Sequence, residues 1–390
     1  MAMTLTACVP VSTPPAPTAP ITPAATVQFT ATPAPSPVPE RNAGVILHQN
    51  NPQRTGLYDF AAIRGPVNVL WQADLSGRIF GAPMFADGLL YVCGFNTVYI
   101  FDAQTGEQME AIRGIGAPFS PLAVAGDLLI GGDTTEKLLA YDRNSRQQAW
   151  VFDTDGAIYN APLVIGEIVY AVSERGVYAL DLQTGEVIWQ VDLGDHRGFV
   201  GHPAYENGTL FAGVGGSYYA LDGLTGEIRW QIERASDQWF YSSALANGRV
   251  YVGSEDGYFY ALDQQSGAEA WKSQRVGPGW SAPAIADGMI YAGNRDHHIY
   301  AWDAMTGQEL WRFETVDWAV SDPILSDGMV YVGVGNHENK EGPRPFYALD
   351  ATTGHEVWQF EADARLMTAA TLGPEAVYVV SVTGTVYALR

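Results

Sequence analysis

The sequence predicts an all-β protein, an eight-bladed β-propeller with four-stranded antiparallel blades. One pattern of aromatic, small and acidic residues returns about every 40 residues, a period typical of propellers. Its aspartates stand at positions 102, 142, 181, 222, 263, 303 and 350, and an eighth copy at 387–390 ends the chain. No helical pattern of useful length interrupts these copies, so we expect strands alone.

Within one repeat the pattern indicates four strands joined by tight turns. In the sixth repeat we expect strands at 280–286, 289–293, 299–302 and 309–313. Asp287-Gly288 separates the first two strands, and Asp-Gly or Asn-Gly pairs recur at this place in other repeats. Such pairs adopt the positive φ angles that two-residue hairpin turns need. The repeat is therefore read as one antiparallel blade.

The two ends of the repeat region complement one another. Residues 69–73 read as an isolated fourth strand, whereas residues 366–389 supply the first three strands of a blade and no fourth. Joining them completes the eighth blade and removes free sheet edges, which invite aggregation. We predict that the N-terminal outer strand closes the ring by pairing with the C-terminal blade.

Composition excludes several functions. The chain has 21 Lys plus Arg against 43 Asp plus Glu, a net charge of −22, and such a surface repels nucleic-acid phosphates. Its two cysteines, Cys8 and Cys93, cannot make a disulfide framework or a Cys-based zinc site. There is no uninterrupted run of about 18 apolar residues to span a bilayer. We therefore expect no nucleic-acid partner, and membrane contact only through a lipid anchor.

The first 43 residues differ from the rest. Leu5-Thr6-Ala7-Cys8 resembles the lipobox of bacterial lipoproteins, in which the cysteine carries lipid. Residues 1–8 lack the basic start and apolar stretch of a full signal, so we interpret them as a truncated one. Residues 9–43 are rich in Pro, Thr and Ala and predict a disordered tether. We expect an extracytoplasmic protein, lipid-anchored to the bacterial cell envelope through Cys8 or secreted; the alternative is an incidental cysteine in an unstructured terminus.

The repeats over residues 44–390 carry a family resemblance. The motif Ala-x-Asp-x-x-Thr-Gly-x-x-x-Trp, as in 179–189, resembles the tryptophan-docking motif of the PQQ-like, or quinoprotein-type, eight-bladed propellers. The segment 51–56 also resembles the stretch that precedes their first blade. The resemblance implies that each motif Trp packs between neighbouring blades against a Thr-Gly turn. These residues are Trp71, Trp150, Trp189, Trp230, Trp271, Trp311 and Trp358. Glu110 replaces one Trp, and Asn144-Ser145-Arg146 replaces one turn.

The resembled family contains PQQ-dependent dehydrogenases and non-catalytic, BamB-like lipoproteins, so fold alone does not decide function. The enzymes typically carry long insertions, an adjacent Cys-Cys pair against the quinone, and a calcium ion held by acidic and amide side chains. This chain has no Cys-Cys pair and almost no insertions. We therefore expect the BamB-like branch, with no catalytic residue and neither PQQ nor calcium as cofactor.

Two short motifs contain residue types that bind metal ions, but neither has the pattern of a metal site. Asp153-Thr154-Asp155-Gly156 looks like the start of a calcium loop, but its twelfth position is Val164 instead of a bidentate Glu. His297 and His298 lie between the second and third predicted strands of the sixth repeat, and adjacent side chains of an extended chain point to opposite faces and do not easily share one metal. We expect no metal site.

The first strand of each propeller blade lines the central channel. The residues seven positions before each first hairpin turn are Phe80, Phe119, Tyr159, Val200, Phe240, Trp280, Val320 and Met367. This largely aromatic ring either packs between blades or forms an amphipathic rim for a peptide or glycan. Both interpretations stay open.

Two positions further along, most residues are small, as a narrow channel requires, but His202 and Asp322 are not. They either solvate the channel through water or mark a polar binding spot. The seventh repeat is longer, with 47 residues from Asp303 to Asp350, and its extra residues fall in 335–345. We expect this insertion on the same face as the loops that hold Trp239 and Trp318.

The sequence therefore predicts a non-catalytic, monomeric scaffold that recognises a protein, peptide or glycan of the cell envelope at one mouth of the channel. The candidate binding residues are Trp239, Trp280, Trp318, His202, Asp322, Tyr159, Phe240 and His337. The alternative function is that of a PQQ-dependent dehydrogenase-like quinoprotein.

Overall fold

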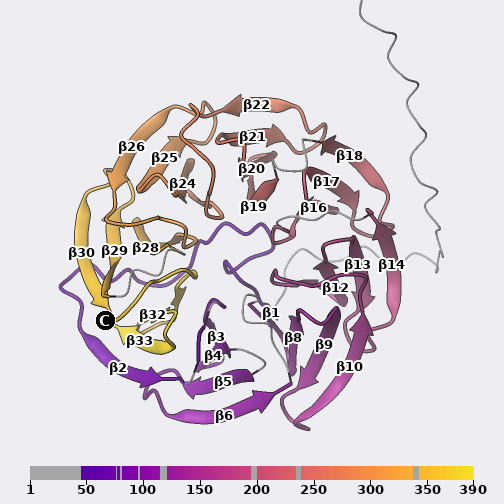
Figure 1. The fold of residues 1–390 in the computed structure, drawn as a ribbon, viewed down its shortest axis with the longest axis horizontal. Coiled ribbons are helices and arrows are strands. Elements are labelled where there is room, and N and C mark those ends of the chain that lie inside the picture. Colours follow the sequence, from indigo (N-terminus) through magenta and orange to yellow (C-terminus); the bar gives the residue numbers. More distant parts are fainter. Residues whose placement is uncertain are drawn as a thin grey trace, which may run out of the picture.

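Eight β-sheets form a ring around a central channel (Figure 1). The computed structural model describes residues 45–75, 77–79, 81–94, 97–114, 121–194, 200–233, 239–336 and 342–390. All regular elements within these ranges are strands. The predicted eight-bladed β-propeller is confirmed. Cys8, the tether 9–43, Phe80, Phe119 and His337 lie outside the described residues.

The first four blades follow one another along the chain, and each runs from the channel to the rim. Blade 1 contains β3 (Met84–Ala86), β4 (Leu89–Gly94), β5 (Thr97–Asp102) and β6 (Gln108–Arg113). Blade 2 contains β7 (Ala123–Ala125), β8 (Leu128–Gly132), β9 (Lys137–Asp142) and β10 (Gln147–Asp153). Blade 3 contains β11 (Leu163–Ile165), β12 (Ile168–Val172), β13 (Gly176–Asp181) and β14 (Val187–Asp192). Blade 4 contains β15 (Ala204–Glu206), β16 (Thr209–Val214), β17 (Ser217–Asp222) and β18 (Ile228–Glu233).

The remaining blades repeat this order, except that the last one takes its outer strand from the N-terminal side. Blade 5 contains β19 (Phe240–Ala246), β20 (Arg249–Ser254), β21 (Phe259–Asp263) and β22 (Glu269–Lys272). Blade 6 contains β23 (Ala284–Ala286), β24 (Met289–Asn294), β25 (His298–Asp303) and β26 (Glu309–Glu314). Blade 7 contains β27 (Ile324–Ser326), β28 (Met329–Gly333), β29 (Arg344–Asp350) and β30 (Glu356–Ala362). Blade 8 contains β31 (Thr371–Leu372), β32 (Val377–Val380), β33 (Thr385–Leu389) and β2 (Val69–Asp74).

The ring closes as predicted, because the outer strand β2 pairs antiparallel with the C-terminal strand β33. Beyond the ladder, the Asn68 and Arg390 backbones exchange two hydrogen bonds, of 2.7 and 2.9 Å. The inner strand of the sixth repeat is shorter than predicted. Only 284–286 pair continuously, and Trp280 contributes an isolated bridge to Asn294.

The repeated aspartates belong to the hairpins between the third and fourth strands. In blade 1, Asp102 accepts hydrogen bonds from the Thr105 N–H and hydroxyl, each at 2.8 Å. These bonds stabilise the ionised form and lower the carboxyl pKa of Asp102. Asp303 bonds to Thr306 in the same way. The aspartates therefore serve turn geometry.

Tryptophans on the outer strands join neighbouring blades. Trp189 donates its indole N–H to the Gly223 carbonyl at 2.9 Å, and a Cβ at Gly226 would lie 2.7 Å from the indole. Only glycine lets the ring lie this close. Trp71, Trp150, Trp230, Trp271 and Trp311 each donate to the next blade in the same manner. Trp358 donates instead to Ile63, because blade 8 has no hairpin between its third and outer strands.

The joint between blades 1 and 2 uses an ion pair in place of an indole. Glu110 stands at the Trp position, and Arg146 stands at the glycine position of the facing turn with φ of 58°. The Arg146 Nε lies 3.6 Å from Glu110 Oε1. The two departures from the repeat motif therefore compensate one another.

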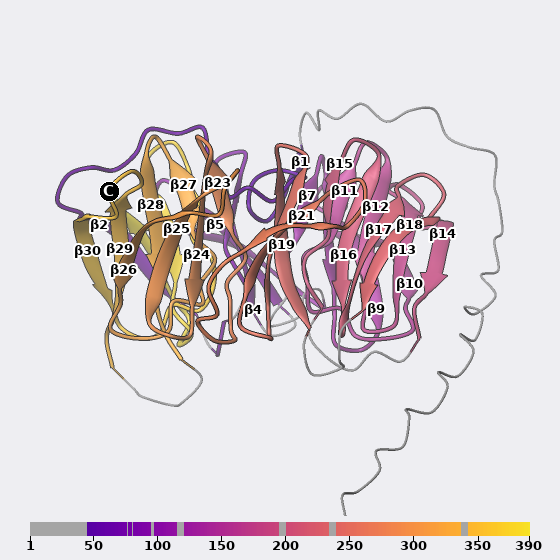
Figure 2. The same cartoon turned by 90° about the horizontal axis from the view of Figure 1, so that it is seen from above.

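The residues before β2 form a second element that the sequence did not predict, which we call the arm (residues 45–66). Its first strand, β1 (Val45–Ile46), pairs with the inner strand β7. The arm then crosses the channel along one face of the ring (Figure 2). Its carbonyl groups accept hydrogen bonds from four inner strands in turn, Pro52 from Tyr205, Gln53 from Leu245, Thr55 from Ile285 and Gly56 from Leu325.

Arg54 fixes the arm at the centre of the channel and is completely buried. Its guanidinium donates to the carbonyl groups of His48 at 2.6 Å, Pro203 at 2.9 Å, and Ala161 and Pro162 at 3.2 Å each. Burial lowers the pKa of Arg54 to about 9, so it remains a cation at neutral pH. One side chain thus joins the arm to blades 3 and 4.

We predict that Arg54→Met lowers the free energy of unfolding by about 3 kcal/mol or more, because it leaves several buried carbonyl groups without a donor. Arg54→Lys keeps the charge but lacks the planar guanidinium with its several donors, so its loss of unfolding free energy should be intermediate. Denaturant titration of both variants measures this. A loss below about 1 kcal/mol for Arg54→Met would contradict the anchoring role.

We predict that Glu110→Trp combined with Arg146→Gly raises stability by about 1 kcal/mol, since the pair restores an indole against a glycine turn. Glu110→Trp alone should not raise stability, because the Arg146 Cβ would clash with the new indole ring. Thermal and denaturant unfolding of the single and double variants gives the coupling energy. Additive effects of the two changes would show that this joint works differently from the others.

Candidate functional site

The channel is closed at one face and open at the other. The arm crosses the face that carries the first hairpin turns, which we call the turn face, and leaves there only a cavity of about 110 Å³ beside blades 1 and 8. The opposite face, the channel-mouth face, opens into a cavity of about 520 Å³. Residues from all eight blades line this cavity, and His48 of the arm contributes to its lining.

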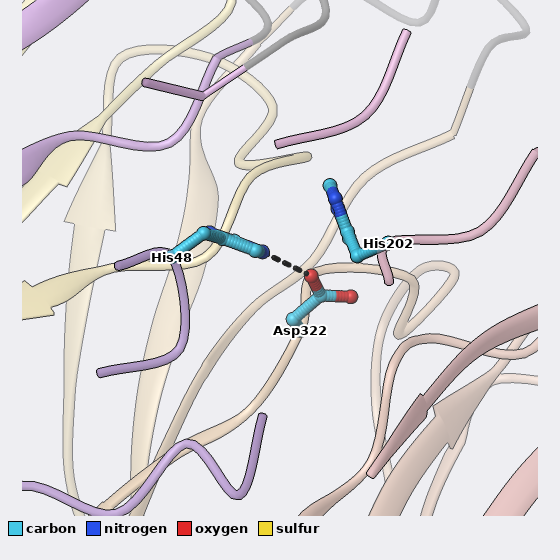
Figure 3. Close-up of side chains that lie close together, drawn as sticks. All are labelled: His48, His202 and Asp322. Atoms are coloured by element: carbon cyan, nitrogen blue, oxygen red, sulfur yellow. Dashed lines mark hydrogen bonds and ion pairs between the residues drawn. The ribbon is translucent and has the colours of Figure 1, made fainter. Parts of the chain in front are cut away.

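Three polar side chains come together in the cavity (Figure 3). His48 Nε2 lies 3.1 Å from Asp322 Oδ2, and the His48 and His202 ring centroids are 4.5 Å apart. His202 and Asp322 were singled out in the sequence, and the structure brings them to the same place. His48 was missed, since it lies 274 positions from Asp322 with no local signal.

The hydrogen bonds assign the protons of this cluster. Burial lowers the pKa of His48 and lowers that of His202 well below its usual value, so both imidazoles are neutral at pH 7. His202 Nδ1 accepts from the Ala161 N–H at 2.8 Å, which places the His202 proton on Nε2. His48 Nε2 donates to Asp322, whose other oxygen accepts from the Ala282 N–H at 2.8 Å.

These bonds also explain why large polar residues are tolerated in a narrow channel. Each connects one blade to the residue at the same position in the preceding blade, as Ala161 N–H to His202, His202 N–H to Ser242 and Ala282 N–H to Asp322 show. The side chains therefore lie flat along the channel wall. Neither earlier interpretation included this direct link between blades.

The cluster has the composition of a metal site, since ligand atoms of His48, His202 and Asp322 all lie within 4.8 Å of one another. The hydrogen bonds of the cluster do not leave the lone pairs that a metal ion needs. His202 Nδ1 is already an acceptor, so its Nε2 bears a proton in place of a lone pair. The imidazoles also lie against each other at 50° with their rings in contact. A metal would have to break the bond to Ala161.

The other candidate residues separate into two groups. Phe240 and Trp280 are buried between blades, at 0% and 3% exposure. Tyr159 is 38% exposed in the cavity wall, and Trp239 and Trp318 are half-buried at the channel-mouth face. The ring predicted from the sequence is thus part core and part rim.

Arg295 is a further polar residue of the cavity that the sequence reasoning missed. It follows β24, and its guanidinium lies 5.2 Å from the centre of the Trp318 ring. Its stem passes Gly279, where a Cβ would lie only 2.2 Å from Arg295 Cδ. Among the described residues no carboxylate forms an ion pair with it, and its Nε lacks a hydrogen-bond partner.

Comparison with known proteins agrees with this architecture. A family model described as outer membrane protein assembly factor BamB matches residues 94–198, 173–281 and 276–390, well over half of the chain. The chain belongs to this family of PQQ-like propellers. BamB from Moraxella catarrhalis has the same fold, with a TM-score of 0.68 at 17% identity over 83% of this chain and 99% of that one. Quinohemoprotein alcohol dehydrogenase from Comamonas testosteroni also shares it, with a TM-score of 0.72 at 14% identity over 90% and 81%.

Two curated proteins match this chain over shorter stretches. BamB of Shewanella oneidensis is 27% identical over 147 residues, 31% of this chain and 35% of that protein. Serine/threonine-protein kinase AfsK of Streptomyces coelicolor is 28% identical over 121 residues, 31% of this chain and 14% of the kinase. The matched part thus spans well under half of either relative. In the part of the chain that the structure describes, no helix is long and apolar enough to cross a membrane.

We predict that acid destabilises the propeller through the two buried histidines. Their folded pKa values lie below 6.5, so below pH 6.5 the unfolded chain binds protons that the folded chain does not. Stability should be nearly constant from this pH to about pH 8, because few groups titrate there. It should then fall by up to about 1.4 kcal/mol per pH unit for each histidine, before the carboxylates titrate near pH 4.

Unfolding titrations between pH 7 and 5 measure this slope. His202→Asn should reduce it by about 1.4 kcal/mol per pH unit, since its amide oxygen can still accept from Ala161 without titrating. His355→Asn makes the same substitution at an exposed position and is the matched control for the loss of a histidine. An equal slope in His202→Asn and the unmodified protein would contradict a neutral His202.

Proposed function

We propose that this protein is a non-catalytic scaffold of the cell envelope that binds a protein partner at the channel-mouth face. The observation that carries the proposal is the difference between the two faces. The turn face is closed by the arm and consists largely of regular hairpin turns. At the channel-mouth face, Tyr159 and Trp239 line an open cavity and Trp318 lies against Arg295 of its wall. Aromatic anchors of this kind dominate binding surfaces.

Buried polar contacts hold the loop of Trp318 in place. Asp317 accepts from the Trp318 N–H at 2.8 Å, from Asn336 Nδ2 at 2.6 Å and from Arg344 Nε at 2.8 Å. Asn336 and Arg344 both belong to the segment 335–345 that holds the extra residues of the seventh repeat. A preformed loop loses little conformational entropy on binding, which favours this surface as an anchor.

The residues present do not fit the quinoprotein alternative. Cys93 is fully buried, and burial raises its thiol pKa to about 12, so it is an inert core residue without an adjacent cysteine. Among the described residues, the cavity lining contains one carboxylate, Asp322, whose oxygens accept from His48 and Ala282, and no amide side chain. These lining residues do not provide the partners that PQQ and calcium have in the enzymes.

The location in the envelope and the lipid anchor are part of the same proposal. It is supported by the family membership and by the lipobox-like sequence ending at Cys8, followed by the Pro-rich tether. Since the matching family model and one relative are described as outer membrane protein assembly factor BamB, a protein that takes part in outer membrane protein assembly is one candidate partner.

Site-specific photo-crosslinking in the native envelope tests the binding face. A crosslinker in place of Trp239 or Trp318 should capture a partner, whereas one in place of Asp287 on the turn face should not. With the captured partner purified, Trp239→Ala should weaken binding by about 2 kcal/mol, or about 30-fold in Kd. Trp318→Ala should have a similar effect while the melting temperature stays near that of the unmodified protein.

Asp287→Lys provides the matched control, because Asp287 is exposed in a turn of the opposite face. It should change Kd by no more than about threefold. A partner lost on this change but retained by both tryptophan variants would place the binding surface on the turn face.

A further inference from the structure

Two polar side chains of the cavity have hydrogen-bonding capacity that their contacts with described residues do not use. His202 lines the cavity with Nε2–H as a donor, and among the described residues no acceptor for it is found. Asp322 has one hydrogen bond on each carboxylate oxygen, so each retains a free lone pair. An obligate donor thus lies beside an obligate acceptor, at the wall of an open cavity. A hydroxyl group, which donates and accepts, satisfies both.

The charges of the cavity favour a neutral ligand. An anion would face Asp322 in a protein of net charge −22, and a cation would face the guanidinium of Arg295, which forms no ion pair with any described residue. Desolvating a charge against a like charge is costly. Hydroxyl groups can hydrogen-bond to both Asp322 and Arg295 without this cost.

The walls of the cavity provide flat and apolar surface. Tyr159 and Trp239 expose ring surface, and Val320 and Met367 are half-buried beside them. Aromatic faces of this kind pack against the C–H face of a molecule whose edge carries hydroxyl groups. The volume, about 520 Å³, lies within the range of ordinary small-molecule sites.

We propose that the cavity binds a neutral saccharide of one or two rings. Hydroxyl groups of the sugar bond to Asp322 and His202, and its apolar face lies on Tyr159 or Trp239. This site goes beyond the scaffold function, and either can hold without the other. A free sugar and the end of a glycan chain present the same chemistry.

Calorimetric titration of the full chain tests the proposal. The neutral probes are glucose, N-acetylglucosamine and maltose, and glucuronate and glucosamine are their charged counterparts. We expect saturable binding of a neutral probe by about 10 mM, and at least about tenfold weaker binding of both charged sugars. A preference for a longer oligosaccharide of the same sugar would indicate the end of a glycan chain as the natural source.

Variants locate the site. Asp322→Asn keeps the oxygen that accepts from Ala282 and a group that His48 can bond, so it should fold, yet weaken the sugar by about tenfold. Tyr159→Ala should weaken it similarly through lost stacking. Asp87→Asn makes the same chemical change at an exposed turn of the opposite face and should have no effect.

Three results would overturn the inference. These are no saturable binding of any neutral probe, tighter binding of a charged sugar than of its neutral counterpart, or equal affinity in Asp322→Asn and Asp87→Asn. Because sugar binding and partner capture are measured separately, failure of one leaves the other standing. If Asp322→Asn does not fold, Tyr159→Ala alone decides, since Tyr159 is exposed in the wall and outside the histidine cluster.

Discussion

The hydrogen bonds of the buried Arg54 guanidinium are the interaction on which the rest of this structure depends. A propeller's inner strands are sheet edges, and their free N–H groups face the channel. The arm covers four of them, and Arg54 holds it there through carbonyl groups of two blades and of the arm itself. The same arm continues to Ile63, which takes the indole N–H of Trp358 at the seam of blades 7 and 8. One continuous segment, the arm followed by β2, thus covers the channel and closes the ring.

The arm also gives the molecule two unlike faces. It seals the turn face and delivers His48 to Asp322 in the cavity, so the histidine cluster exists only when the arm is in place. Burial contributes most to the lowered pKa of His202, and His48 and the charge of Arg54, both residues of the arm, lower it further. Fold stability and the chemistry of the cavity are therefore coupled through residues that belong to neither blade nor loop.

The sequence was informative where interactions are local. The Asp102 hairpin and the Asp287-Gly288 turn form within a few residues, so their pattern repeats visibly. The arm escaped prediction because its partners lie far away in the sequence, as with Arg54 and Ala161, which are 107 positions apart. His48 and Arg295 escaped prediction because neither lies in a recurring motif. The segment 51–56 was noticed by resemblance alone, and its physical role became clear only from the carbonyl groups it presents.

The inner ring shows how such a propeller can change its binding chemistry without changing its fold. At this ring, backbone N–H groups of Ala161, His202 and Ala282 each meet a side chain of the next blade. Any short polar residue with an acceptor can fill that role, so one blade's residue can be exchanged independently of the others. What such a residue presents to the cavity differs, however: imidazole offers a donor, carboxylate an acceptor, hydroxyl both. At this ring of the propeller, the groups presented to the cavity can therefore vary blade by blade at little structural cost.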